Sequence, residues 1–177
     1  MSDKIKIAIS SCLLGYPVRY DGGHRLDPYL RDKLGQLVEW VPVCPEAECG
    51  LPVPREPMQI IDDGASRRLV AISSGIDHTV RLMIWAKKKL SDLEKLDLRG
   101  FVFKARSPSC AVRDAQIVTP SGSAAGKAAG LFTEAVLRSF PSLPVHDEEA
   151  LQDPAVIGGF IERIGAPGRG QIDFKGD

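Results

Sequence analysis

Three cysteines, Cys12, Cys44 and Cys110, each follow a short apolar run that is typical of a buried β-strand. The runs read IKIAIS before Cys12, EWVPV before Cys44 and GFVFK before Cys110. In a mostly parallel sheet the carboxyl ends of the strands lie at one edge, and ligands bind in the crevice beyond that edge. We therefore expect the three thiols to meet at one site, although they are far apart in the sequence.

Sulfur ligands of this kind suit several metal groups, because thiolates favour zinc, copper(I) and iron–sulfur clusters. Structural zinc needs four ligands, which Cys12, Cys44, Cys49 and Cys110 would supply, and the C-x4-C spacing of Cys44 and Cys49 is compatible with zinc. An iron–sulfur cluster on three cysteines would instead leave one iron open to a substrate. Ordinary buried thiols are a third interpretation, and the spacing leaves all three open.

Two polar side chains lie beside these cysteines. Glu46 stands two residues after Cys44, where its carboxyl group could exchange protons with a substrate. Ser107 stands three residues before Cys110, where its hydroxyl could donate a hydrogen bond or relay a proton. The same hydroxyl could equally close a turn by bonding to its own backbone. A proline follows Cys44 and another follows Ser107, so both loops are restricted, as a preorganised site requires.

The elements that must position these residues alternate between strand-like and helix-like segments. This alternation predicts a single α/β domain over residues 1–164, with a mostly parallel, Rossmann-like sheet flanked by helices and the cysteine site at the carboxyl ends of its strands. Strands are expected at residues 5–10, 39–43, 58–61, 69–72, 100–104, 115–119 and 143–145. Helices are expected at residues 28–38, from 79 to about 95, at 130–140 and at 154–164.

Local signals refine these elements. Pro42 within the second strand suggests an edge position, and the turn at residues 62–64 predicts a hairpin. Asp27 and Asp77 are expected to cap the first two helices. The long second helix should turn its apolar residues inward, namely Val80, Met83, Ile84, Leu90 and Leu93. Residues 165–177, rich in Gly and charge, are expected to form a flexible tail.

Composition limits the classes of function. Among 177 residues, Lys plus Arg and Asp plus Glu both number 23, and such a balance does not favour strong nonspecific binding of nucleic acid. No run approaches the ~18 apolar residues of a membrane span, and the first six residues do not read as a signal peptide. We therefore expect a cytoplasmic protein, whose four cysteines are thiols or metal ligands rather than disulfides.

Three sequence blocks carry a resemblance to a known family. The blocks SSCLLGYPVRYDGGH, VCPEAECGLPVPRE and KARSPSC together resemble the thiouracil desulfurase family, over residues 4–145. The resemblance implies an α/β domain that holds a [4Fe-4S] cluster on Cys12, Cys44 and Cys110. It also implies non-redox removal of sulfur from 2-thiouracil-like bases, with the substrate's sulfur captured at the open iron and with uracil and sulfide as products.

The resemblance further implies roles for individual residues. It matches Glu46 to the family's acid–base glutamate and Ser107 to its essential serine. Polar residues of the same loops are expected to contact the substrate: Ser11, Tyr20, Asp21 and Ser109. No reductant is expected to be needed, because the exchange of C=S for C=O with water is hydrolytic.

Two departures from the family pattern keep alternatives open. Cys49 stands where the family usually has glycine, so a zinc-stabilised, non-catalytic binding module is one alternative. Residues 131–154 resemble a longer branch of the family that removes sulfur from 4-thiouridine in tRNA, which is the other alternative. Our leading hypothesis is a desulfidase that acts on a free thiopyrimidine or its nucleoside.

Overall fold

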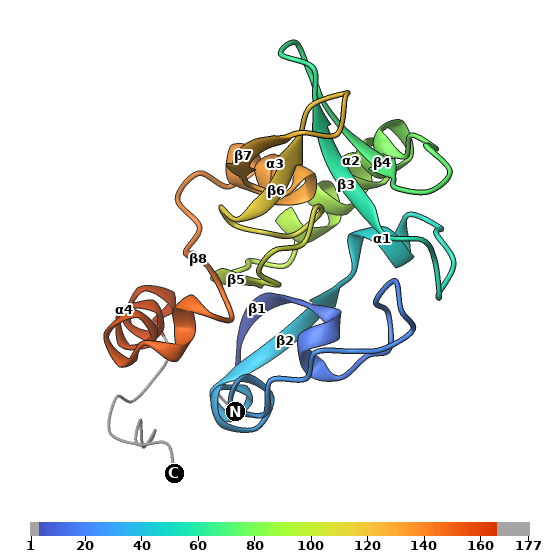
Figure 1. Ribbon diagram of the computed structural model, residues 1–177. Coiled ribbons are helices and arrows are strands. Elements are labelled where there is room, and N and C mark those ends of the chain that lie inside the picture. Colours follow the sequence, from blue (N-terminus) through green and yellow to red (C-terminus); the bar gives the residue numbers. More distant parts are fainter. Residues whose placement is uncertain (1–3, 166–177) are drawn as a thin grey trace.

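The computed structural model describes residues 4–165, which form two four-stranded sheets joined by helices (Figure 1). The first sheet has the order β2-β1-β5-β8 and all its strands are parallel. Its strands are β1 (Ile5–Ser10), β2 (Val38–Val43), β5 (Gly100–Phe103) and β8 (Val145–Asp147). The second sheet has the order β4-β3-β6-β7 and mixes parallel and antiparallel pairs. Its strands are β3 (Met58–Asp62), β4 (Arg67–Ala71), β6 (Ala115–Val118) and β7 (Ala124–Ala128).

Four α-helices and several shorter turns complete the described part of the chain. The helices are α1 (Pro45–Glu48), α2 (Thr79–Glu94), α3 (Leu131–Ser139) and α4 (Pro154–Ile164). The 3₁₀ helices are Ser11–Leu14, Leu34–Gln36 and Ala150–Gln152, and a π-helical turn spans Tyr29–Lys33. Within residues 4–165, no helix combines the length and the apolar character that crossing a membrane requires. All but the first residue of the expected tail lies outside the described residues.

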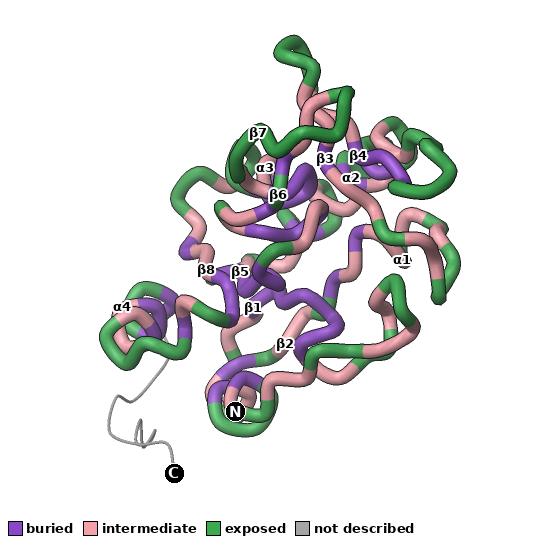
Figure 2. Tube along the Cα trace, in the orientation of Figure 1, coloured by how far each residue is buried: buried purple, intermediate pink, exposed green. Residues whose placement is uncertain are grey.

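The central strands β1 and β5 of the first sheet are buried on both faces, because their side chains alternate between two helical layers (Figure 2). Ile7 and Ile9 of β1 pack with α4 and the turns before β2, whereas Ala8 between them faces α2 and α3. On β5, Phe101 and Phe103 stack with ring centroids 3.9 Å apart and pack against α3. Each fully buried side chain of this size contributes about 1.5–3 kcal/mol. Burial on both faces fixes the register of the strands.

The parallel register brings the carboxyl ends of the strands to one edge. Ser10 at the end of β1 pairs with Val43 at the end of β2, and the last residues of β5 and β8 pair in the same way. The segments that contain Cys12, Cys44 and Cys110 leave the sheet at this edge. The predicted α/β architecture with a parallel sheet flanked by helices is confirmed.

Most predicted elements are present, with differences at their bounds. β2 is an edge strand, as Pro42 suggested, and β3 and β4 form the predicted antiparallel hairpin. β8 begins at Val145, two residues later than the predicted strand. β7 was not predicted, because its five residues AAGKA are small or polar and mostly exposed. Its pairing with β6 forms part of a second sheet that local patterning did not indicate.

The prediction for the inward face of α2 was wrong for Val80, Met83 and Ile84, which are exposed, and correct for Leu90 and Leu93, which pack in the core. Val80 and Ile84 are 71% and 69% exposed, whereas Leu82 and Ala86 are fully buried. Leu93 is buried as predicted. The helix carries apolar residues on two faces, and packing against β5 and α3 selected the face on which the small Ala86 permits close approach.

The helix predicted for residues 28–38 is shorter than expected. Asp27 accepts a hydrogen bond from the Leu30 N–H at 3.0 Å, so it caps the segment as predicted. The chain then forms a π-helical turn and a 3₁₀ turn, and β2 begins at Val38. Gly35 lies in this segment, and glycine disfavours a continuous helix.

Candidate active site

One pocket lies at the carboxyl edge of the first sheet and is lined by Cys12, Cys44 and Cys110 together. Its volume of about 450 Å³ falls within the range of small-molecule sites. Cys12 follows β1, Cys44 caps α1 directly after β2, and Cys110 lies in the loop after β5. The sequence prediction that the three thiols share one site is confirmed.

The surroundings of the three thiols disfavour their ionised, thiolate forms when no metal group is bound. Burial, with nearby Cys44 adding to it, raises the pKa of Cys12 to about 11. Burial raises the pKa of Cys44 and raises that of Cys110 well above its usual range, and in Cys110 the neighbouring Cys44 and Glu46 add to the effect. A positively charged metal group would compensate the thiolates, so this donor set fits an iron–sulfur cluster.

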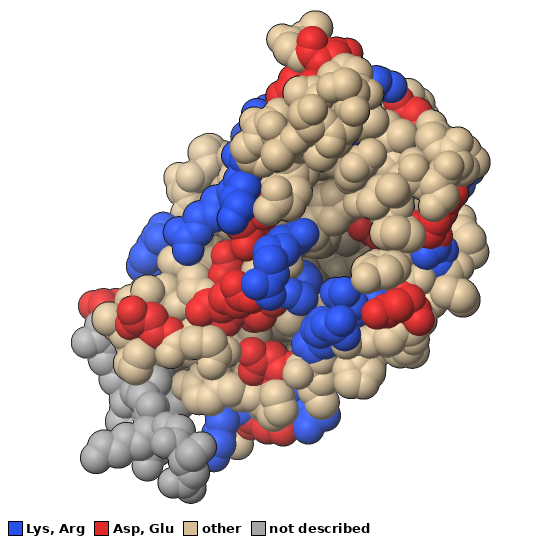
Figure 3. All heavy atoms as spheres, in the orientation of Figure 1, with Lys and Arg blue, Asp and Glu red and all other residues tan. Residues whose placement is uncertain are grey.

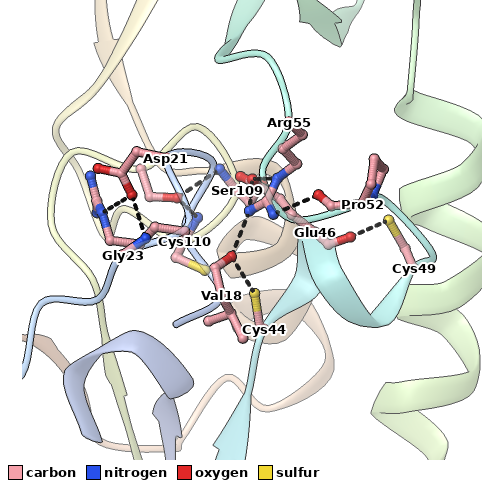
Figure 4. A network of polar contacts seen from close by, with 12 residues as sticks. Val18, Asp21, Gly23, Cys44, Glu46, Cys49, Pro52, Arg55, Ser109 and Cys110 are labelled. Atoms are coloured by element: carbon pink, nitrogen blue, oxygen red, sulfur yellow. Dashed lines mark hydrogen bonds and ion pairs between the residues drawn. The ribbon is translucent and has the colours of Figure 1, made fainter. Parts of the chain in front are cut away.

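Cys49 does not join this set. Its Sγ donates to the Glu46 carbonyl at 3.2 Å, and its side chain packs with Leu69, Leu82 and Leu131. Figure 4 shows its sulfur directed at the Glu46 carbonyl and lying apart from the sulfurs of Cys44 and Cys110. Within residues 4–165, no three His, Cys, Asp or Glu side chains are arranged to hold a single metal ion. The fourth thiolate that a zinc site would need is thus not on the pocket wall.

Glu46 lines the pocket, and both of its carboxyl oxygens accept hydrogen bonds. Arg55 Nε and Nη2 donate to Oε2 at 2.8 and 2.6 Å, and Ser109 Oγ donates to Oε1 at 2.8 Å (Figure 4). The side chains of Glu46 and Arg55 are only 13% and 7% exposed. Hydrogen bonds between charged groups are strong under such conditions, so the carboxyl group is held in one place.

Ser107 lines the pocket and also closes a turn. Its Oγ accepts hydrogen bonds from the N–H groups of Ser109 at 3.2 Å and Cys110 at 3.1 Å. The turn interpretation of the sequence is therefore correct, yet it does not exclude a chemical one. A serine hydroxyl that accepts two bonds still has its own proton to donate.

The four residues expected to contact the substrate divide into two pairs. Ser11 and Tyr20 line the pocket. Asp21 and Ser109 are not among the residues that line it. Asp21 is exposed and accepts from the Gly23 N–H at 2.9 Å, while Ser109 is fully buried behind Glu46. The structure thus gives these two side chains partners within the protein.

Two charged residues of the pocket wall, Arg55 and Lys104, were missed in the sequence. Lys104 directly follows β5, and Glu148 directly follows β8. Their side chains form an ion pair, and the two residues are only 8% and 9% exposed, respectively. The strand-end argument that found the cysteines could also have found Lys104 and Glu148, because each directly follows a strand. Arg55 lies in the loop between α1 and β3, and only the tertiary structure connects it with Glu46.

Cations gather around the pocket, although the whole chain is balanced. Figure 3 shows Lys and Arg side chains beside the hollow on this face, and five cationic residues line the pocket. These residues are Arg19, Arg25, Arg55, Lys104 and Arg106. Arg19 and Lys104 both act to lower the pKa of Cys12, against the larger effect of burial. The pocket is therefore suited to hold negative charge.

Several known proteins are similar to this chain. The chain is 35% identical over 109 residues to the uncharacterized protein YbbK of Bacillus subtilis (strain 168), which covers 59% of this chain and 72% of that protein. Its structure resembles that of a [4Fe-4S]-dependent thiouracil desulfidase, TudS, with a TM-score of 0.67, 32% identity, and coverage of 88% of this chain and 99% of the other. The 2-thiouracil desulfurase family matches residues 7–148. The chain therefore belongs to the 2-thiouracil desulfurase family.

Proposed function

We propose that this protein uses a [4Fe-4S] cluster, bound by Cys12, Cys44 and Cys110, to remove sulfur hydrolytically from a thiolated pyrimidine. The observation that carries the proposal is one pocket that combines three thiols with Glu46 and Ser107. The structural similarity to TudS, a [4Fe-4S]-dependent thiouracil desulfidase, supports it. Held by these three cysteines, a cluster would supply a Lewis-acidic iron without a protein ligand, which would polarise the C=S group of the substrate.

The reaction exchanges C=S for C=O without a change of oxidation state. Water adds its oxygen to the carbon that carries the sulfur, the C–S bond breaks, and the two protons of the water leave with the sulfur as hydrogen sulfide. Glu46 would take a proton from the water and return one to the departing sulfur. Ser107 would donate its free hydroxyl proton to charge that develops on the substrate.

A small substrate suits this site better than tRNA. The pocket volume of about 450 Å³ is that of a small-molecule site, and the chain as a whole has equal numbers of acidic and basic residues. Tight binding of tRNA needs a surface that neutralises several phosphates. We therefore propose a free thiopyrimidine or its nucleoside as the substrate.

The test is turnover of 2-thiouracil by anaerobically reconstituted protein in ¹⁸O-labelled water, without an electron donor. We expect uracil and sulfide in equal amounts, ¹⁸O in the uracil, and about four irons per chain. Protein that binds zinc but no iron would overturn the cluster. A strict need for a stoichiometric electron donor would overturn the hydrolytic reaction.

A further inference from the structure

The side chain of Arg55 is almost fully buried. Its guanidinium nitrogens donate hydrogen bonds to the Glu46 carboxyl group and to two backbone carbonyls. Two of its nitrogens, Nε and Nη2, donate to the same oxygen of Glu46. Nη2 also donates to the Val18 carbonyl at 3.0 Å, and Nη1 donates to the Pro52 carbonyl at 3.3 Å. The fixed geometry of the guanidinium group therefore ties Glu46 to two stretches of backbone.

Glu46 needs such a support, because its own helix cannot orient it. α1 has only four residues, and a glutamate side chain has several rotatable bonds. Arg55 occupies Oε2 and Ser109 occupies Oε1, so the plane of the carboxyl group is fixed from both sides. The carboxyl group stays on the pocket wall in one orientation.

The same network reaches the segments around all three cysteines. The backbone N–H of Arg55 donates to the backbone carbonyl of Tyr20 at 2.8 Å, in the loop that follows Cys12. The Val18 carbonyl that accepts from Arg55 also lies 3.9 Å from the Cys44 sulfur, which donates to it. Ser109, the other partner of Glu46, directly precedes Cys110. Arg55 therefore fixes Glu46 relative to the thiols and not only relative to its own loop.

We infer that Arg55 is a positioning residue, which holds the Glu46 carboxyl group in its reactive orientation beside the cysteine site. This inference rests on the proposed function, in which Glu46 transfers protons. Lysine cannot replace arginine here, because its single nitrogen cannot reproduce the paired bonds to Glu46 and the bonds to two carbonyls. A shift of ~1 Å in a reacting group can reduce the rate by about 10²-fold.

The first test is Arg55→Lys, which keeps the positive charge and removes the paired hydrogen bonds from Nε and Nη2 to Glu46. We expect kcat to fall by about 10–10²-fold, while KM for 2-thiouracil stays within about twofold. Iron content should match that of the unmodified protein, and the fall in melting temperature caused by the lost hydrogen bonds should leave the variant folded at the assay temperature. Arg67→Lys is the matched control, because Arg67 pairs with Asp62 at 3.2 Å on the β3–β4 hairpin and is expected to leave all four quantities unchanged.

The second test places Arg55→Lys in a Glu46→Gln background. If Arg55 acts through Glu46, the two losses are not additive, and the double variant is no slower than Glu46→Gln alone. Equal fold-losses in both backgrounds, unchanged kcat in Arg55→Lys, or loss of iron from Arg55→Lys would each overturn the inference. Full activity of Glu46→Gln would instead refute the proposed role of Glu46 itself, so the two failures are distinguishable.

Discussion

The ammonium group of Lys104 donates a hydrogen bond to the buried carboxyl group of Glu148, and the two residues directly follow neighbouring parallel strands. Lys104 also donates to the Ala105 carbonyl at 3.1 Å, and the second oxygen of Glu148 accepts from the Ala105 N–H at 2.7 Å. The pair therefore joins the ends of β5 and β8 beside the pocket. Lys104 lines that pocket, so the same bond shapes its wall.

Breaking this pair should destabilise the fold. Glu148→Ala leaves the Lys104 charge buried without a partner, which we expect to lower the free energy of unfolding by about 3–5 kcal/mol. Urea denaturation measures the change. The matched control is Glu134→Ala, which breaks the more exposed pair with Arg138 and should have a small effect. Equal losses in the two variants would show that burial of the Lys104–Glu148 pair is not what matters.

The cysteines should differ in their importance for iron binding. Replacing Cys12, Cys44 or Cys110 by Ser should each abolish the cluster, because each removes one of three thiolates at the pocket. Cys49→Ser should keep it, because Cys49 packs outside the pocket. Iron and sulfide analysis of anaerobically reconstituted variants, with the visible spectrum, measures the outcome. A loss of iron in Cys49→Ser equal to that in the other three would restore the four-cysteine interpretation.

Glu46 and Ser107 should contribute to turnover without contributing to cluster binding. Glu46→Gln and Ser107→Ala are expected to keep their iron and to lose about 10²–10⁴-fold in kcat, since acid–base groups contribute on that order. Single-turnover release of sulfide measures the loss. Glu48→Gln is the matched control: it keeps an acceptor for the Cys44 N–H and lies outside the pocket. Wild-type rates in the two site variants would remove both residues from the mechanism.

The size of the substrate can be tested by competition. At matched concentrations of 2-thiouracil, 4-thiouridine and tRNA that contains 4-thiouridine, we expect higher kcat/KM on the small molecules. Sulfide release across a salt series measures the preference, because neutralisation of phosphates makes tRNA binding fall steeply with salt. Much higher kcat/KM on tRNA, collapsing as salt rises, would refute the small-substrate proposal and leave the cluster chemistry unaffected.

Much of the fold followed from local patterns. β5 and residues 7–9 of β1 are apolar at successive positions, which is typical of strands buried on both faces, and Pro42 correctly indicated an edge strand. The inward face of α2 did not follow, because its sequence carries apolar residues on two faces. Contact with Leu69 of β4 and Leu131 of α3 buried Leu82, while Val80 remained exposed.

The sequence by itself determined that Cys12, Cys44 and Cys110 meet, because each follows a strand and parallel strands end at one edge. Only the tertiary structure decided what surrounds them. Cys49 is separated from the other thiols by the turn of α1, and Glu46 is held by Arg55 and by a serine 63 residues away in the sequence. Strand ends are set by patterns within one segment, whereas these bonds join loops whose relative positions depend on how the whole chain packs.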